Sequence, residues 1–125
     1  MTSSRILDCR PSIAGKIAFV TGGCGGIGRA CVSSLVEHGA TVAFTFAEGR
    51  ESAEVVQQII DIAPERVSAH PLDLRSFESI ERCMNGVIER CQRIDILVNN
   101  AAVGSATVAA YADEAAAQDS AMFAI

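Results

Sequence analysis

An α/β fold built on a parallel sheet is the class that this sequence predicts, and two patterns indicate it. Four short apolar or β-branched runs alternate along the chain with stretches whose apolar residues recur at helical spacing. The first run leads directly into a string rich in glycine that opens the first helical stretch. Such alternation is typical of right-handed βαβ units, so we expect helices on both faces of a four-stranded parallel sheet.

The first strand and helix lie on either side of the glycine string. Residues 17–20 are short and apolar and are closed by Thr21 and Gly22, which favours a strand buried on both faces. Apolar residues then recur at helical spacing over 27–36, and Gly39 follows where a left-handed helix end would fall. The sequence therefore predicts a helix of about three turns.

The middle of the chain predicts a second strand and a second helix. Residues 41–46 are β-branched and aromatic, which is typical of a strand. Residues 51–62 place four apolar side chains on one helical face. Pro64 should end this helix because proline lacks a backbone donor.

Two further strands follow, with a helix between them. Residues 67–72 predict a third, weaker strand, because Pro71 removes a ladder hydrogen bond and is typical of sheet edges and strand ends. Residues 77–90 carry an apolar stripe and predict a helix, and residues 94–98 predict the fourth strand. The alanine-rich tail from 105 to 125 favours one more helix. The members of the apolar stripe are Phe77, Ile80, Met84, Val87, Ile88 and Cys91.

Composition narrows the classes of function. Half of the 125 residues are hydrophobic and a fifth are charged, which fits one compact soluble domain. The net charge is -5 and no basic cluster occurs, so we expect no nucleic-acid partner. No apolar run approaches the roughly 20 residues of a membrane-spanning helix, and the N-terminus lacks an apolar signal core. We therefore expect a cytoplasmic protein without a membrane partner.

The five cysteines suggest neither a metal site nor a disulfide framework. Their number is odd and no two of them form a C-x-x-C pair, so we expect reduced thiols and no bound metal. Most of them should be small apolar fillers. Cys24 lies in the glycine string, where a helix N-terminus could lower its pKa and make it a redox-sensitive thiol.

The string from Thr21 to Gly28, TGGCGGIG, is the motif that carries most of the functional information. It matches both G-x-G-x-x-G and T-G-x-x-x-G-x-G. Glycine is needed in such a string for a tight turn and for close approach of the backbone to a pyrophosphate, and the helix that follows offers free N–H groups to the anion. A purely structural glycine turn is the competing interpretation.

The chain resembles the short-chain dehydrogenase/reductase family, because three of that family's signatures occur in order after predicted strands. They are the glycine string, Asp73-Leu74 and Asn99-Asn100-Ala101-Ala102. The resemblance implies the N-terminal half of a Rossmann-type domain, with an extension over 1–12 and a partial NAD(P)-binding domain over 13–125.

The resemblance also implies cofactor-binding residues. By it the glycine string wraps the pyrophosphate, the Asp73 carboxylate accepts a hydrogen bond from the adenine amino group, and Asn99 lies near the adenosine ribose. From the residues alone, Asp73 could instead be a turn or capping acid, and Asn99 and Asn100 could be turn formers. Asp95 suggests only a solvated or capping carboxylate. The expected cofactor-binding set is Gly22, Cys24, Gly25, Gly26, Ile27, Gly28, Asp73, Leu74, Asn99 and Ala101.

NADP is the cofactor that the sequence favours, with NAD as the alternative. An NAD-preferring member would carry a carboxylate at the end of the second strand, where Phe46 stands. Glu48 could replace that acid, whereas Arg50 could reach a 2′-phosphate. The basic residue that NADP-preferring members carry in the glycine loop is Gly25 here.

By the same resemblance, the function is hydride transfer between the nicotinamide and a small carbonyl or alcohol substrate, in a parent protein that forms homo-oligomers. The family's catalytic tyrosine has a lysine four residues later. Here the sole tyrosine, Tyr111, is followed at that position by Ala115, and the sole lysine is Lys16. We therefore assign no catalytic residue and expect this stretch alone to be inactive. A non-catalytic nucleotide-binding or regulatory interaction module is the alternative.

Overall fold

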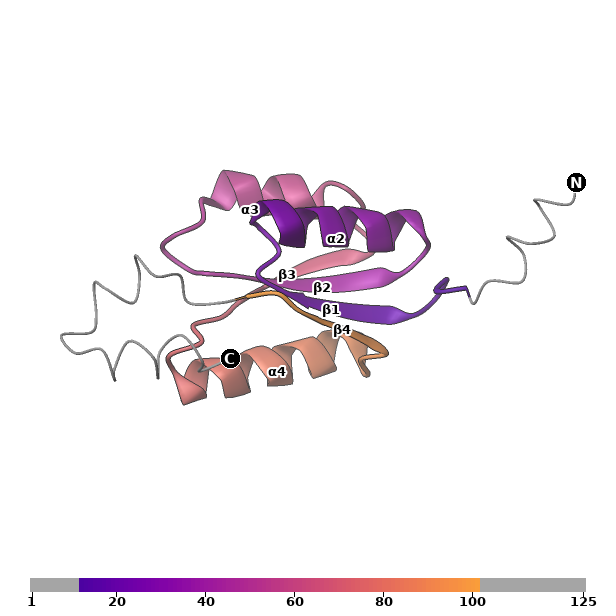
Figure 1. Ribbon diagram of the computed structural model, residues 1–125. Coiled ribbons are helices and arrows are strands. Elements are labelled where there is room, and N and C mark those ends of the chain that lie inside the picture. Colours follow the sequence, from indigo (N-terminus) through magenta and orange to yellow (C-terminus); the bar gives the residue numbers. More distant parts are fainter. Residues whose placement is uncertain (1–11, 102–125) are drawn as a thin grey trace, which may run out of the picture.

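The computed structural model of the chain describes residues 12–101 (Figure 1). The helix expected over 105–125, Tyr111 and all but the last residue of the expected N-terminal extension lie outside the described residues. Within 12–101 the chain folds as one parallel sheet with helices packed on it.

The four strands run parallel in the order β3-β2-β1-β4. The central strand β1 pairs with β2 on one side and with β4 on the other, so that Val20 lies beside both Phe44 and Val98. This arrangement confirms the predicted sheet. The strands are β1 (Ile17–Thr21), β2 (Thr41–Phe46), β3 (Val67–Pro71) and β4 (Ile96–Asn99).

Helices cover both faces of the sheet, as predicted. Helices α2 and α3 lie on one face and α4 lies on the other (Figure 1). The change of face follows from the strand order, because the chain leaves β3 at one edge and must cross β2 and β1 before it enters β4. The helices are α2 (Gly26–Glu37), α3 (Ala53–Ile60) and α4 (Phe77–Cys91).

The sheet separates two hydrophobic cores, because successive side chains of a strand point to opposite faces. The smaller core, on the α4 side, contains the buried side chains of Phe19, Ala43, Cys83 and Val87. The larger core lies between the sheet and helices α2 and α3. Its buried members are Ala18, Val20, Val32, Val36, Ala40, Val42, Phe44, Val56, Ile59 and Val67.

Helix α3 is shorter than the apolar pattern over residues 51–62 predicts, because a capping residue determines where it begins. The Ser52 hydroxyl accepts a hydrogen bond from the Val55 N–H at 3.2 Å, so α3 begins at Ala53. This helix ends at Ile60, several residues before Pro64, so the proline does not itself end it. Gly39 follows α2 at φ 96°, which confirms the predicted left-handed position.

The predicted apolar stripe of α4 is only partly buried. Phe77 is 78% exposed, and Met84 and Ile88 are also exposed in the structure. The helix buries Cys83 and Val87, because only one narrow side of it faces the sheet. The prediction is therefore wrong about which side chains of α4 are buried, but its extent, residues 77–90, is confirmed to within one residue.

Asp95 caps the start of the sheet. Its carboxylate accepts a hydrogen bond from the Ile17 N–H at 2.8 Å, and the Arg93 guanidinium lies 3.0 Å from it. The hydrogen bond from Ile17, together with Arg93, holds the pKa of Asp95 below its usual value. The capping interpretation is therefore confirmed, and β4 begins at Ile96, two residues after the predicted start at residue 94.

Candidate nucleotide-binding site

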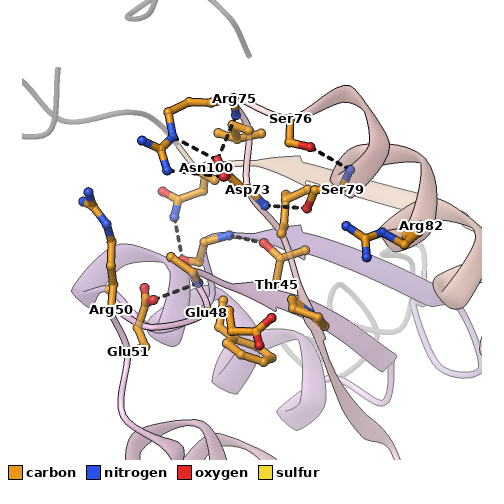
Figure 2. A pocket seen from close by; sticks show the side chains of 18 residues that line it. Thr45, Glu48, Arg50, Glu51, Asp73, Arg75, Ser76, Ser79, Arg82 and Asn100 are labelled. Carbon is orange, nitrogen blue, oxygen red and sulfur yellow. Dashed lines mark hydrogen bonds and ion pairs between the residues drawn. The ribbon is translucent and has the colours of Figure 1, made fainter. Parts of the chain in front are cut away.

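A cleft of about 590 Å³ lies at the edge of the sheet where the parallel strands end (Figure 2). Its walls come from the residues that follow β1, β2, β3 and β4 and from the first turns of α4. Open parallel sheets bind ligands at this edge, beside the point where the strand order reverses. The fold places that reversal at β1, between β2 and β4.

Three glycines of the string are required by the shape of the loop. Gly22 has φ 72°, a conformation that residues with a side chain rarely adopt. A Cβ on Gly23 would lie 2.6 Å from the Phe44 ring, and one on Gly28 would lie 1.9 Å from the Gly22 carbonyl oxygen. These glycines let the first turn of α2 pack against the loop and the loop against the sheet.

Hydrogen bonds from β1, β2 and the end of β4 hold the glycine loop in place. The buried Thr45 hydroxyl accepts from the Gly22 N–H at 2.9 Å, and the Asn100 side-chain amide donates to the Gly22 carbonyl at 3.0 Å. The Thr21 hydroxyl accepts from the backbone N–H groups of Asn100 and Ala101, each at 3.0 Å. The loop is thus preorganised by the side chains of Thr21, Thr45 and Asn100.

The N-terminus of α2 differs from those of the other described helices. Helices α3 and α4 are capped by the hydroxyls of Ser52 and Ser76 and carry an acid in the first turn. In α2 the cap position is Gly25, without a side-chain hydrogen bond, and no acid follows. The first N–H groups of a helix have no partner within it, and the helix dipole favours an anion there.

Space for such an anion exists beside this helix. A Cβ added at Gly25 or Gly26 would meet no atom within 4 Å, in contrast to Gly22, Gly23 and Gly28. The absence of side chains at these two positions is therefore not required by packing within the described residues. Glycine here leaves room for a group that approaches the backbone closely, as a pyrophosphate does.

The corner between β3 and α4 is fixed by Asp73 and Ser79. The Asp73 N–H donates to the Ser79 hydroxyl at 2.8 Å, and the Asp73 carboxylate accepts from the Arg75 N–H at 3.0 Å. The Arg75 guanidinium contacts both carboxylate oxygens, at 3.0 and 3.3 Å. These bonds from Arg75 hold the pKa of Asp73 below its usual value. Asp73 is thus a turn acid, as its alternative interpretation states, and it also lines the cleft.

The charged lining of the cleft is mixed. Its carboxylates are Glu48, Glu51 and Asp73, and its guanidinium groups are those of Arg50, Arg75 and Arg82. The Glu51 carboxylate accepts from the Ala47 N–H at 2.7 Å, and Asp73 is paired with Arg75. The apolar Phe46 also lines the cleft at the end of β2.

The cleft brings together half of the residues predicted from the sequence. Gly22, Gly25, Asp73, Leu74 and Ala101 line it. The other predicted residues do not: Gly28 packs within the loop, Gly26 begins α2, Ile27 is 74% exposed, Asn99 is exposed, and Cys24 packs against the larger core.

Several cleft residues are ones that sequence reasoning missed. Thr45 is buried at the carboxyl end of a strand, and that polar position within an apolar run was the only signal for it. Asn100 belongs to a recognised signature but was not in the expected cofactor-binding set; its side chain donates to the Gly22 carbonyl, whereas the Asn99 side chain accepts from the Thr21 hydroxyl. The hydroxyl of Ser79 and the guanidinium of Arg75 gave no signal, because their roles depend on the β3–α4 corner.

The redox interpretation of Cys24 is not supported. Burial, together with the nearby Glu51 carboxylate, raises the pKa of the Cys24 thiol. A thiol with a raised pKa remains protonated and is a poor nucleophile, whatever the helix N-terminus contributes.

The described residues contain neither a metal-binding cluster nor a membrane-spanning helix. Within 12–101 no three His, Cys, Asp or Glu side chains are grouped so that they could hold a metal ion. In the same part of the chain, no helix has the length and apolar character needed to cross a membrane.

The fold and the cleft define a parallel α/β protein with the N-terminal part of a Rossmann-type sheet. Comparison with solved structures agrees. A short-chain dehydrogenase/reductase of Serratia marcescens matches with a TM-score of 0.68 and 34% identity, over 76% of this chain and 39% of that one. A blue fluorescent protein from a metagenomic library, solved in complex with NADPH, matches with a TM-score of 0.67 and 32% identity, over 74% of this chain and 38% of that one.

The chain belongs to the short-chain dehydrogenase/reductase family of oxidoreductases. The short chain dehydrogenase family profile matches residues 16–124, which is most of the sequence. Among curated proteins, NADPH-dependent aldehyde reductase 1 of Arabidopsis thaliana, a chloroplastic protein, is 38% identical over 103 residues. That match covers 76% of this chain and 36% of the reductase. The chain therefore spans little more than a third of the length of this relative.

Proposed function

We propose that this chain is the cofactor-binding part of an NADP(H)-linked oxidoreductase that transfers hydride between the nicotinamide and a small carbonyl or alcohol compound. The observation that supports this most directly is the uncapped start of α2 beside two glycines whose Cβ positions are open. Together they offer backbone donors and room to a pyrophosphate. The bound dinucleotide would supply the hydride chemistry.

The same proposal assigns the pyrophosphate and the adenine of the dinucleotide to residues of the cleft. The glycine loop and the start of α2 would hold the pyrophosphate, and Asp73 with Leu74 would hold the adenine. Asn100 and Thr45 would act indirectly, by fixing Gly22. We place the acid–base chemistry outside this stretch of sequence, because Tyr111 has no lysine four residues later.

NADP rather than NAD is the preferred dinucleotide in this proposal. Phe46 at the end of β2 cannot accept hydrogen bonds from ribose hydroxyls, whereas Arg50 also lines the cleft and its guanidinium can pair with a phosphate. Glu48 and Glu51 oppose this preference by their charge. Glu51, however, is already engaged with the Ala47 N–H. The relatives described as NADPH-dependent or as an NADPH complex support the same choice.

The test is a titration of the full natural polypeptide that contains this sequence with NADPH and with NADH. We expect binding of both and a lower Kd for NADPH. Arg50→Gln should raise the Kd for NADPH several-fold, about the effect of one charge-assisted contact, and leave NADH unchanged. Absence of binding to either dinucleotide would contradict the proposal.

A second assay separates an enzyme from a non-catalytic nucleotide-binding module. The same polypeptide is mixed with NADPH and a panel of aldehydes and ketones, and the loss of reduced nicotinamide is followed. Turnover is the expected result. Tight NADPH binding without turnover on any substrate would favour the non-catalytic module.

A further inference from the structure

The ion pair between Asp73 and Arg75 lies in the wall of the cleft, and Arg75 contacts the carboxylate through three donors. Two guanidinium nitrogens and the backbone N–H of Arg75 all donate to the Asp73 carboxylate, at 3.0 to 3.3 Å (Figure 2). Both side chains remain partly exposed, at 46% for Asp73 and 37% for Arg75. Both residues also line the cleft, so the pair borders the space that a ligand would enter.

The backbone beneath this pair is fixed as well. The Asp73 N–H donates to the Ser79 hydroxyl, and the Ser76 N–H donates to the Asp73 carbonyl at 3.1 Å. The position of the Asp73 carboxylate is thus fixed twice: through the hydrogen-bonded backbone of Asp73 and through the two guanidinium nitrogens of Arg75. Three donors occupy three of the roughly four lone-pair sites of a carboxylate, which leaves one direction for a further donor.

We propose that Arg75 is a positioning residue for adenine recognition, which acts by orienting the Asp73 carboxylate so that its remaining acceptor site faces the cleft. This inference rests on the proposed function. A side chain that is already immobilised loses little conformational entropy when a ligand binds, so preorganisation increases affinity without a new contact. Arg75 itself touches neither the phosphates nor the adenine in this proposal.

The test compares Arg75→Lys and Arg75→Ala with the wild type in the full natural polypeptide. Lysine keeps the charge but lacks the planar fork that engages both carboxylate oxygens. We expect both variants to raise the Kd for NADPH and for NADH equally, by about fivefold, which is the loss expected when one side chain must be immobilised on binding. Arg93→Ala is the matched control, because it removes an arginine paired with Asp95 at the opposite edge of the sheet.

Two further measurements show whether Arg75 acts through Asp73. In the background of Asp73→Ala, the Arg75→Ala change should have no additional effect on dinucleotide binding. Reduced nicotinamide hypoxanthine dinucleotide replaces the adenine amino group with an oxygen, so its Kd should be the same for wild type and Arg75→Ala. If the role of Arg75 were merely structural, Arg75→Ala would weaken the binding of all three dinucleotides.

The alternatives predict other results. Loss of NADPH binding alone would show a direct contact between Arg75 and the 2′-phosphate. Wild-type affinity in Arg75→Lys would show a general effect of charge. If Arg75→Ala raised the Kd equally in the wild-type and Asp73→Ala backgrounds, the inference would also be overturned. If the wild type bound neither natural dinucleotide, the proposed function itself would fail, and this inference with it.

Discussion

Replacing Gly28 with alanine would place a methyl group against the backbone of the glycine loop. Its Cβ would lie 1.9 Å from the Gly22 carbonyl oxygen and 2.9 Å from the Asn100 side-chain nitrogen. Overpacking of this kind costs up to about 3 kcal/mol, and loss of the hydrogen bond between Asn100 and Gly22 adds about 1 kcal/mol. We expect Gly28→Ala to lower the free energy of unfolding by about 4 kcal/mol, a large part of the 5 to roughly 15 kcal/mol of a typical domain.

Gly26→Ala is the matched comparison, two residues earlier in the same string. Its Cβ meets no atom within 4 Å, and its φ is not positive, so the stability should be unchanged or higher by up to about 1 kcal/mol. The methyl group would nevertheless occupy the space proposed for the pyrophosphate. Both variants should therefore lose nucleotide affinity, but only Gly28→Ala should lose stability.

The assay is chemical denaturation without nucleotide, followed by titration with NADPH under native conditions. Gly28→Ala should also lower Tm by about 10 °C, at a few degrees per kcal/mol. A wild-type denaturation midpoint for Gly28→Ala would refute the packing argument. Wild-type NADPH affinity for a stable Gly26→Ala protein would refute the placement of the pyrophosphate.

Three more predictions each concern a single residue. Thr45→Val should cost about 1 to 3 kcal/mol of unfolding free energy in urea denaturation, because it leaves the Gly22 N–H without its acceptor; an unchanged midpoint would contradict this. Asp95→Ala should destabilise the protein at neutral pH. The Ile17 N–H lowers the pKa of Asp95 below its usual 3.8. The difference in free energy of unfolding between wild type and variant should therefore be complete above about pH 5 and shrink as the pH falls through the folded-state pKa. A difference that persists in acid would contradict this linkage. Gly25→Glu should raise the Kd for NADPH at least about tenfold, as measured by titration, because it places a side chain and a negative charge in the space proposed for the pyrophosphate; an unchanged Kd would contradict that placement.

The strands were the part of the fold that could be predicted most closely. β2 has the predicted bounds, and β1 extends the predicted run by one residue, to Thr21. Both are central strands, buried on both faces, so a continuous apolar run identifies them. Pro71 ends β3 at one edge of the described sheet, where a missing N–H donor is tolerated.

Only those parts of the candidate site that consist of residues adjacent in sequence could be predicted. The glycine string indicates its own loop, because turn geometry and close backbone approach act within a few residues. The Asn100 side chain bonds to Gly22, and the Arg75 guanidinium is directed at Asp73 by the β3–α4 corner. Contacts of this kind depend on how elements are placed in space, and periodicity carries no information about them.

The bonds that join Thr21 to Asn100 and Ala101 connect the beginning of the described sheet to its end. During synthesis, β1, α2 and β2 could associate as soon as they emerge from the ribosome, since their contacts are local in sequence. The glycine loop would acquire its final shape only after Asn100 has emerged and β4 has docked. If the cleft binds a dinucleotide as proposed, a nascent chain should gain that affinity only after β4 has docked, and the bound dinucleotide would then favour the docked state.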